Sequence, residues 1–354
     1  MITTAEAAEA PVGRRVTRLA AMLNVRNVGA VYVWIALIVI FTIWKPSLFP
    51  TARTAKTTLN EYAITGLAAL SVVMPLAAGI FDLSIGSTIG FAGVFAGWSL
   101  NTLGLPPVGA IALTLCAGLA IGLVNSLVVV RMRVDSFIGT LATGAIIAAL
   151  TLWVSGDQII TGNLSGSFMK FASASLAGIQ LPVLYMLVAM LVLGYVLEQT
   201  VFGRRIYAAG YGPEVARLIG VRVPRLRTVS LVCSGVLGSF AGIALAAQLG
   251  SADPTTGSEY LIPAFSAAFV GATQFRHGRF NPWGTIVAVL MIGTGSVGLL
   301  LAGTQQWMPQ VFEGVVLIVA VGITGIQRKR LRTSEQAGRK RQSPPVAAGS
   351  GQAA

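Results

Sequence analysis

The stretch Gly79-Ile-Phe-Asp-Leu-Ser-Ile-Gly-Ser87 contains the only charged side chain in residues 62–130, the carboxylate of Asp82. The residues on both sides form apolar runs of the length, about 20 residues, that crosses a lipid bilayer as a helix. An acid at the centre of a membrane helix costs about 2.5–3.5 kcal/mol on insertion scales. Acids inside membranes therefore usually have a structural or functional role, and the surrounding sequence has to show which one Asp82 has.

The composition is that of a membrane protein. Of the 354 residues 55% are hydrophobic and only 10% are charged, whereas soluble domains carry about 25% charged residues. We therefore predict an all-α polytopic membrane protein with about ten transmembrane helices. Gly, Pro and charged clusters separate ten apolar segments, near 28–44, 59–79, 84–103, 107–130, 136–155, 182–201, 228–249, 260–275, 282–302 and 309–326.

The basic residues support this division. If the N-terminus is cytoplasmic, all but four of the 25 Lys and Arg fall in cytoplasmic segments. The exceptions are Lys45, Arg53, Lys56 and Lys170. Because Lys and Arg accumulate in cytoplasmic loops, we expect both termini in the cytoplasm. Topology also explains the net charge of +13, so no nucleic-acid partner is expected.

Three regions are predicted along the chain. Residues 1–27 form a cytoplasmic leader, and residues 28–327 form the transmembrane domain. Residues 328–354 form a basic cytoplasmic tail that is expected to be disordered, with contact to anionic membrane lipid as its alternative role. The two cysteines, Cys116 and Cys233, lie in apolar runs, and the chain has no phosphate-loop motif. No disulfide, metal site or cofactor is therefore expected in this chain.

A short helix is predicted within the cytoplasmic loop 202–227. Pro213 suits the first position of a helix, and Glu214 complements its positive N-terminal end. Gly220 can end the helix in a left-handed conformation. Since so short a helix is unstable alone in water, we expect it to pack against another structure on the cytoplasmic side.

Six motifs occur in order along the chain. They are Asp82-Leu-Ser-Ile-Gly-Ser87, Gly122-Leu-Val-Asn125, Phe137-Ile-Gly-Thr-Leu-Ala-Thr143, Phe202-Gly-Arg204, Ala216-Arg-Leu218 followed by Gly220, and Leu249-Gly-Ser-Ala-Asp-Pro-Thr-Thr-Gly257. With these motifs, residues 60–327 resemble the membrane permeases of bacterial ATP-binding-cassette (ABC) importers for ribose and related sugars. The same superfamily includes branched-chain amino-acid permeases.

The resemblance implies the ABC importer permease fold in the bacterial cytoplasmic (inner) membrane. It implies a translocation path for a sugar between this chain and a second permease copy, identical or not. A cytoplasmic ABC ATPase would hold the ATP and Mg²⁺, and an extracytoplasmic sugar-binding protein would deliver the substrate. The chain itself would be a transport subunit and not an enzyme.

The resemblance assigns candidate residues to three sites, none of them catalytic or metal-binding. The small Ala216 would let the ATPase backbone approach, and Arg217 would pair with an acid on that partner. The residues expected at the substrate path or a helix cap are Asp82, Ser84, Ser87, Asn125, Thr140 and Thr143. Those expected to couple to the ATPase are Gly203, Pro213, Glu214, Ala216, Arg217 and Gly220. Those expected on the binding-protein side are Asp253, Thr255, Thr256 and Glu259.

Asp82 has two alternative roles. As a helix cap it would accept hydrogen bonds from the N–H groups of Ser84 and Ile85. As a substrate group it would accept bonds from sugar hydroxyls. The position of Asp82 toward the inner end of its span favours the cap.

Two alternatives to a sugar permease remain. Within the same superfamily the substrate could be a branched-chain amino acid, a nucleoside or a signalling sugar. In a different class, an ion-coupled secondary transporter would place acids at the midplane beside broken helices. Asp82 alone offers such a site, because Glu61, Glu198 and Glu313 lie near the ends of spans.

Overall fold

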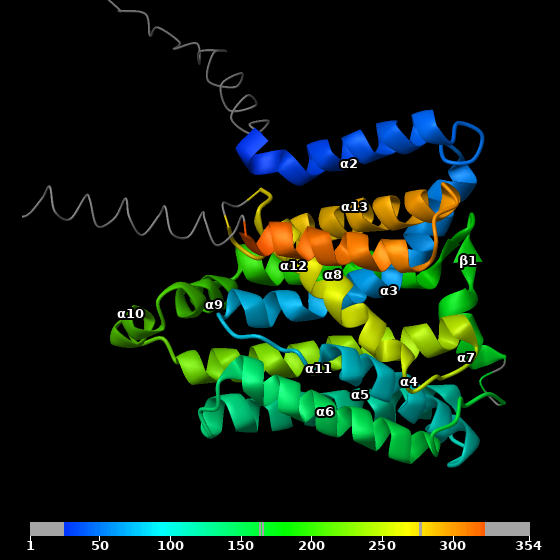
Figure 1. The fold of residues 1–354 in the computed structure, drawn as a ribbon. Helices are drawn as coiled ribbons and strands as arrows, with labels where there is room; N and C mark the ends of the chain where they lie inside the picture. The colour runs from blue at the N-terminus through cyan, green and yellow to red at the C-terminus, as the bar shows by residue number, and fades with distance from the viewer. Residues whose placement is uncertain (1–24, 163, 165, 276–277, 323–354) are drawn as a thin grey trace, which may run out of the picture.

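The computed structural model describes residues 25–322 apart from 163, 165, 276 and 277, and its long helices lie side by side in one bundle (Figure 1). The expected tail 328–354 and nearly all of the leader 1–27 lie outside these residues. In the described part, six helices are long and apolar enough to cross a membrane. They are α3 (Ala52–Ala77), α5 (Pro107–Ser126) with its continuation η1 (Leu127–Arg131), α6 (Ser136–Ser155), α8 (Leu181–Gln199), α11 (Val223–Leu249) and α13 (Pro282–Leu301).

Four further apolar helices belong to the bundle. They are α2 (Val25–Trp44), α4 (Ile85–Asn101), α12 (Leu261–Ala272) and the helix Trp307–Gly322. Each of the ten apolar segments expected from the sequence thus contains a helix, and the chain is an all-α polytopic membrane protein. The remaining elements are small: α7 (Ser167–Ser173), the hairpin β1 (Ser175–Leu176) and β2 (Ile179–Gln180), α9 (Val201–Tyr211), α10 (Pro213–Leu218) and the 3-10 helix η2 (Thr256–Tyr260).

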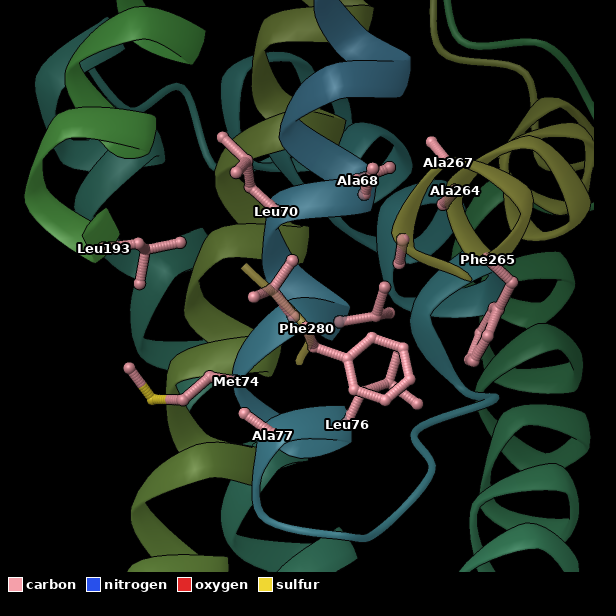
Figure 2. Packing of buried hydrophobic residues seen from close by; sticks show 14 of the residues in the cluster. Ala68, Leu70, Met74, Leu76, Ala77, Leu193, Ala264, Phe265, Ala267 and Phe280 are labelled. Atoms are coloured by element: carbon pink, nitrogen blue, oxygen red, sulfur yellow. The ribbon is translucent and has the colours of Figure 1, made fainter. Parts of the chain in front are cut away.

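The core surrounds α3. This helix packs against α11, α13, α8 and α12. In Figure 2 its side chains Leu70, Met74 and Leu76 lie among residues of the neighbouring segments, including Leu193 of α8 and Phe265 of α12. Because lipid provides no hydrophobic drive between helices, such close packing has to stabilise the bundle.

Glycines make the closest helix contacts possible. A Cβ atom on Gly242 of α11 would collide with the carbonyl oxygen of Ile89 in α4. One on Gly122 of α5 would lie 2.6 Å from the Cα atom of Val232 in α11. The glycines therefore serve tight helix packing here. Gly118 and Gly122, four residues apart on one face of α5, both meet α11.

The two ends of the bundle differ in charge. Helices α9 and α10 project at one end, and the β1–β2 hairpin and α7 lie at the other (Figure 1). The α10 end carries the arginines of α9, α10, η1 and the first turns of α11. The hairpin end carries Lys170 in α7 and Lys56, which lies beside Gly178. The expected membrane orientation depends on this separation of the arginines at the α10 end from the lysines at the hairpin end.

Candidate functional site

Five of the six residues expected at the substrate path or helix cap meet in one hydrogen-bonded cluster. Its centre is the non-helical stretch between α3 and α4. Here Asp82 Oδ1 accepts bonds from the Ser84 N–H (3.2 Å) and the Ser84 hydroxyl (2.6 Å). Asn125 of α5 donates from Nδ2 to Ser84 Oγ (2.7 Å) and to Asp82 Oδ1 (3.4 Å). We call Asp82, Ser84, Asn125, Thr140 and Thr143 the Asp82 cluster.

Two threonines of α6 complete the cluster. The Thr143 hydroxyl donates to Asn125 Oδ1 (2.6 Å). Thr140 Oγ1 accepts the Leu83 N–H (2.9 Å), a backbone donor that the non-helical stretch leaves free. Since buried backbone groups need partners, α5 and α6 satisfy the polar groups of the broken segment and fix its path.

The cluster is closed to solutes in this conformation. Asp82 and Asn125 are each 1% exposed and Thr143 is 7% exposed. The geometry agrees with the cap role in part, because the Ser84 N–H donates to Asp82 as predicted. The second predicted donor, the Ile85 N–H, does not bond to Asp82 in the part of the chain described, and Ser84 itself occupies the N-cap position of α4. The arrangement positions helices and leaves little carboxylate surface for a substrate.

Ser87 lies outside the cluster, and sequence reasoning missed Ser234. Ser87 is half-buried on α4, where its hydroxyl faces Gly144 of α6. Ser234 of α11 is fully buried beside the Asp82 carboxyl, although its hydroxyl has no hydrogen-bond partner among the described residues. The small polar residues of α11 were the only signal that could have indicated it.

The second group of expected residues surrounds α10. Gly220 has φ +81°, the left-handed conformation predicted for the end of this helix. Its N–H donates to the Arg217 carbonyl (3.0 Å), and the Val221 N–H donates to the Ala216 carbonyl (2.9 Å). These bonds close the helix C-terminus. Pro213 occupies its first turn.

One expectation about α10 needs correction. Ala216 is only 2% exposed and packs inside this chain, so it cannot offer its surface to a partner. Arg217 is half exposed and pairs with Glu214 of the same helix at 2.8 Å; its pairing with an acid of a partner stays a prediction. The residues that face outward are instead Val215, Leu218 and Ile219, which are 65%, 87% and 72% exposed. Their hydrophobicity within a predicted cytoplasmic loop is the sequence signal that could have indicated this surface.

Gly203 has an internal role as well. It lies in the first turn of α9, where its N–H bonds to Thr200 Oγ1 (3.2 Å). A Cβ atom there would collide with the carbonyl of Leu197 in α8. Gly203 thus permits the sharp corner between α8 and α9, which places α10.

The third group lies between α11 and α12. Asp253 Oδ1 accepts bonds from the Thr255 N–H (2.8 Å) and hydroxyl (2.7 Å), and Thr256 and Glu259 belong to η2. Thr255 and Glu259 are exposed. The segment is not entirely the outer loop that the sequence predicts, because a Cβ atom on Gly257 would collide with the backbone of Gly90 in α4. Part of it packs into the bundle.

Comparison with known proteins decides the family. A family model described as "Branched-chain amino acid transport system / permease component" matches residues 54–321. The chain belongs to this family. It is a permease component, as the motifs indicate.

Several curated proteins are similar to this permease. It is 33% identical over 286 residues to the ribose import permease protein RbsC of Bacillus subtilis, covering 80% of this chain and 88% of the relative. It is 29% identical to RbsC of Escherichia coli K12, covering 87% and 96%. It is 28% identical to the autoinducer 2 import system permease protein LsrD of Photorhabdus luminescens, covering 83% and 92%.

Proposed function

We propose that this permease is the membrane subunit of an ABC importer and forms the translocation path for a sugar, a pentose, hexose or related compound. The observation that carries the proposal is the 33% identity to a ribose import permease across 80% of the chain. The ordered helix α10, with its three exposed apolar side chains, supports it because an ABC permease needs a surface for its ATPase.

The membrane orientation follows from the two ends. The arginine-rich α10 end faces the cytoplasm and the hairpin end faces outward, since cytoplasmic loops collect Lys and Arg. All ten apolar helices then cross or enter the membrane, and both termini are cytoplasmic in the bacterial inner membrane.

Cysteine labelling tests this orientation in a background without Cys116 and Cys233. An impermeant maleimide added to whole cells should label Lys170→Cys. It should label Arg222→Cys only after the cells are opened. Labelling of both variants in intact cells would contradict the proposed orientation.

The partners follow from the same arrangement. A cytoplasmic ABC ATPase, which holds ATP and Mg²⁺, docks on Val215, Leu218 and Ile219. An extracytoplasmic sugar-binding protein docks at the opposite end, where Thr255 and Glu259 are exposed. A second permease copy completes the path, and lipid surrounds it. This chain needs no cofactor and binds no nucleic acid.

Reconstituted transport tests the function. The permease is placed in liposomes with its cognate ATPase and binding protein. Uptake of labelled ribose, other pentoses, hexoses and autoinducer 2 is compared with uptake of leucine and a nucleoside. We expect ATP-dependent uptake of one sugar-like compound. Uptake of leucine or the nucleoside alone would contradict the sugar assignment, and uptake driven by an ion gradient without ATP would contradict the ABC mechanism.

A further inference from the structure

A cavity of about 1110 Å³ lies at the α10 end, and none of the Asp82 cluster residues lines it. Its walls come from the end of α5 with η1, the connection to α6, α10 and the first turns of α11. Four arginines line it: Arg131, Arg133, Arg217 and Arg227. Of these four arginines, only Arg217 belongs to a motif that the transport function uses.

The positive charge of the cavity is largely uncompensated. The one salt bridge within the described residues joins Arg217 to Glu214, so none reaches the other three arginines. The Nε atom of Arg227 is buried and has no hydrogen-bond partner in the described part of the chain. Burying one donor of a charged group without a partner is costly, and an anion in the cavity would offset that cost.

Asp135, the acid that lines the cavity, caps helix α6. Asp135 Oδ1 accepts the N–H groups of Phe137 (2.9 Å) and Ile138 (3.3 Å), which caps α6. Ser136 Oγ accepts the Phe81 N–H (3.1 Å) and keeps its hydroxyl hydrogen for another acceptor. The cavity therefore presents four arginines and one acid, Asp135, so its lining carries a net positive charge.

The backbone is unusual where it presents two of the arginines. Residues 127–131 form a π-helical turn at the end of α5, a feature frequent at functional sites. Arg133 follows with φ 60°, a left-handed conformation that non-glycine residues rarely adopt. Such strain persists only where the surrounding structure enforces it.

One wall of the cavity is apolar. Leu123 and Leu127 of the α5–η1 segment are 47% and 54% exposed, and Val130 and Val134 line the cavity with them. The cavity thus combines an arginine cluster with an aliphatic surface, which suits a ligand with an anionic head and an apolar tail.

We propose that this cavity binds a phosphate group, which an anionic phospholipid or free phosphate can supply. The planar, always charged guanidinium group matches phosphate oxygens in paired hydrogen bonds. The apolar wall favours the lipid, since acyl chains would cover Leu123 and Leu127. Anionic lipids are abundant at the cytoplasmic leaflet, the side on which the proposed orientation places this end. The site does not depend on which solute the permease carries.

Thermal unfolding of the full-length permease in detergent micelles tests the proposal. The micelles are doped with dioleoylphosphatidylglycerol, with dioleoylphosphatidylcholine, or with neither but with inorganic phosphate. A ligand that binds the folded state raises the melting temperature by mass action. We expect phosphatidylglycerol to raise it in a saturable way, phosphatidylcholine to do so much less, and inorganic phosphate to act only at higher concentration.

Matched arginine variants assign the effect to the cavity. Arg131→Gln and Arg227→Gln should each weaken the apparent affinity for phosphatidylglycerol about tenfold, because each removes a charge-assisted bond. Arg225→Gln removes the same charge from the first turns of α11 but outside the cavity, and its affinity should equal that of the wild type. Arg131 is exposed, so its variant reports on binding even if Arg227→Gln fails to fold.

The outcomes separate the possible occupants. A saturable shift with inorganic phosphate alone, lost in Arg131→Gln, would support the phosphate site and assign free phosphate as its source. If neither probe stabilises the wild type more than Arg131→Gln, the proposal is overturned. Protection of the cavity arginines only by the bound ATPase would also overturn it, because an acidic protein segment would then be the occupant.

Discussion

The Asp82 cluster and α10 both match motifs of the permease family, but their residues face in opposite directions. The motif residues of the Asp82 cluster are buried and bond to one another across three segments of the chain. In α10 the side chains of Val215, Leu218 and Ile219 point outward, and only Ala216 is buried. A motif match therefore identifies a residue as characteristic of the family without showing whether it stabilises the fold or meets a partner.

The Asp82 cluster and α10 also differ in the interactions that stabilise them. The bonds of the Asp82 cluster are screened from water, so removing one partner leaves another stranded. The Arg217–Glu214 pair of α10 joins side chains that are 50% and 80% exposed, and such surface pairs contribute little. We infer that the cluster is a rigid part of the permease, whereas α10 depends on its caps and on its ATPase.

The largest effect is expected from Asp82→Leu. The substitution removes the acceptor for Ser84 and one of the two for Asn125, at about 1–3 kcal/mol for each stranded donor. The permease should lose stability and yield, measured by thermal unfolding of the purified protein in detergent. Asp82→Asn is the control, because its amide oxygen can still accept these bonds. If Asp82→Leu unfolds like the wild type, the cluster does not hold the helices.

Ala216→Trp should have the next largest effect, and it now tests the inward packing of this residue. A large side chain at a site 2% exposed strains the surrounding core by about 1–3 kcal/mol. The melting temperature should fall even without the ATPase, while Ala216→Ser stays close to the wild type. An unchanged melting temperature for the Trp variant would mean that Ala216 faces the partner after all.

A smaller loss is expected from Gly220→Val. The left-handed conformation at this position costs a side-chain-bearing residue about 1–2 kcal/mol, and a β-branched residue tolerates it poorly. Since α10 is held locally, the change should appear as faster hydrogen exchange at Val221, with little change in the bundle. Gly220→Asn is the matched control, because Asn adopts this conformation more readily. Equal exchange in both variants would contradict the role of Gly220 as a cap.

The sequence predicts where the helices lie, but it does not predict which elements pack against one another. Apolar length and charge place a helix in each of ten segments, and Gly220 indicates its own conformation because few residues favour positive φ. The sequence does not reveal that α4 begins where η2 packs against it, since Gly257 and Gly90 meet only after the chain folds back. The sequence prediction also missed α9, which falls in the segment 202–227 interpreted as a loop, and the β1–β2 hairpin, whose two-residue strands give no periodic pattern.

The hydrogen bonds of the Asp82 cluster could not be predicted from the sequence either. Its residues are individually visible in the motifs, but the bond from Thr143 to Asn125 depends on the rotation of α5 against α6. Each of the two helices is placed by a third segment, because Gly122 of α5 meets α11 and Gly144 of α6 meets Ser84, and these contacts form only when the chain folds. For α10, burial of Ala216 is decided by its packing on α9 and α11, so the sequence could identify the helix and not its outer face.

Leu218→Asp and Asp82→Asn, compared in one reconstituted importer, test the central claim most directly. Leu218 is 87% exposed, so its substitution should change the stability of the permease by less than about 0.5 kcal/mol. We predict that Leu218→Asp loses ATP hydrolysis stimulated by the binding protein together with sugar uptake, while Asp82→Asn keeps most of both. Normal hydrolysis in Leu218→Asp, together with abolished uptake in a folded Asp82→Asn, would show that α10 is not the coupling surface and that the Asp82 carboxylate acts on the substrate.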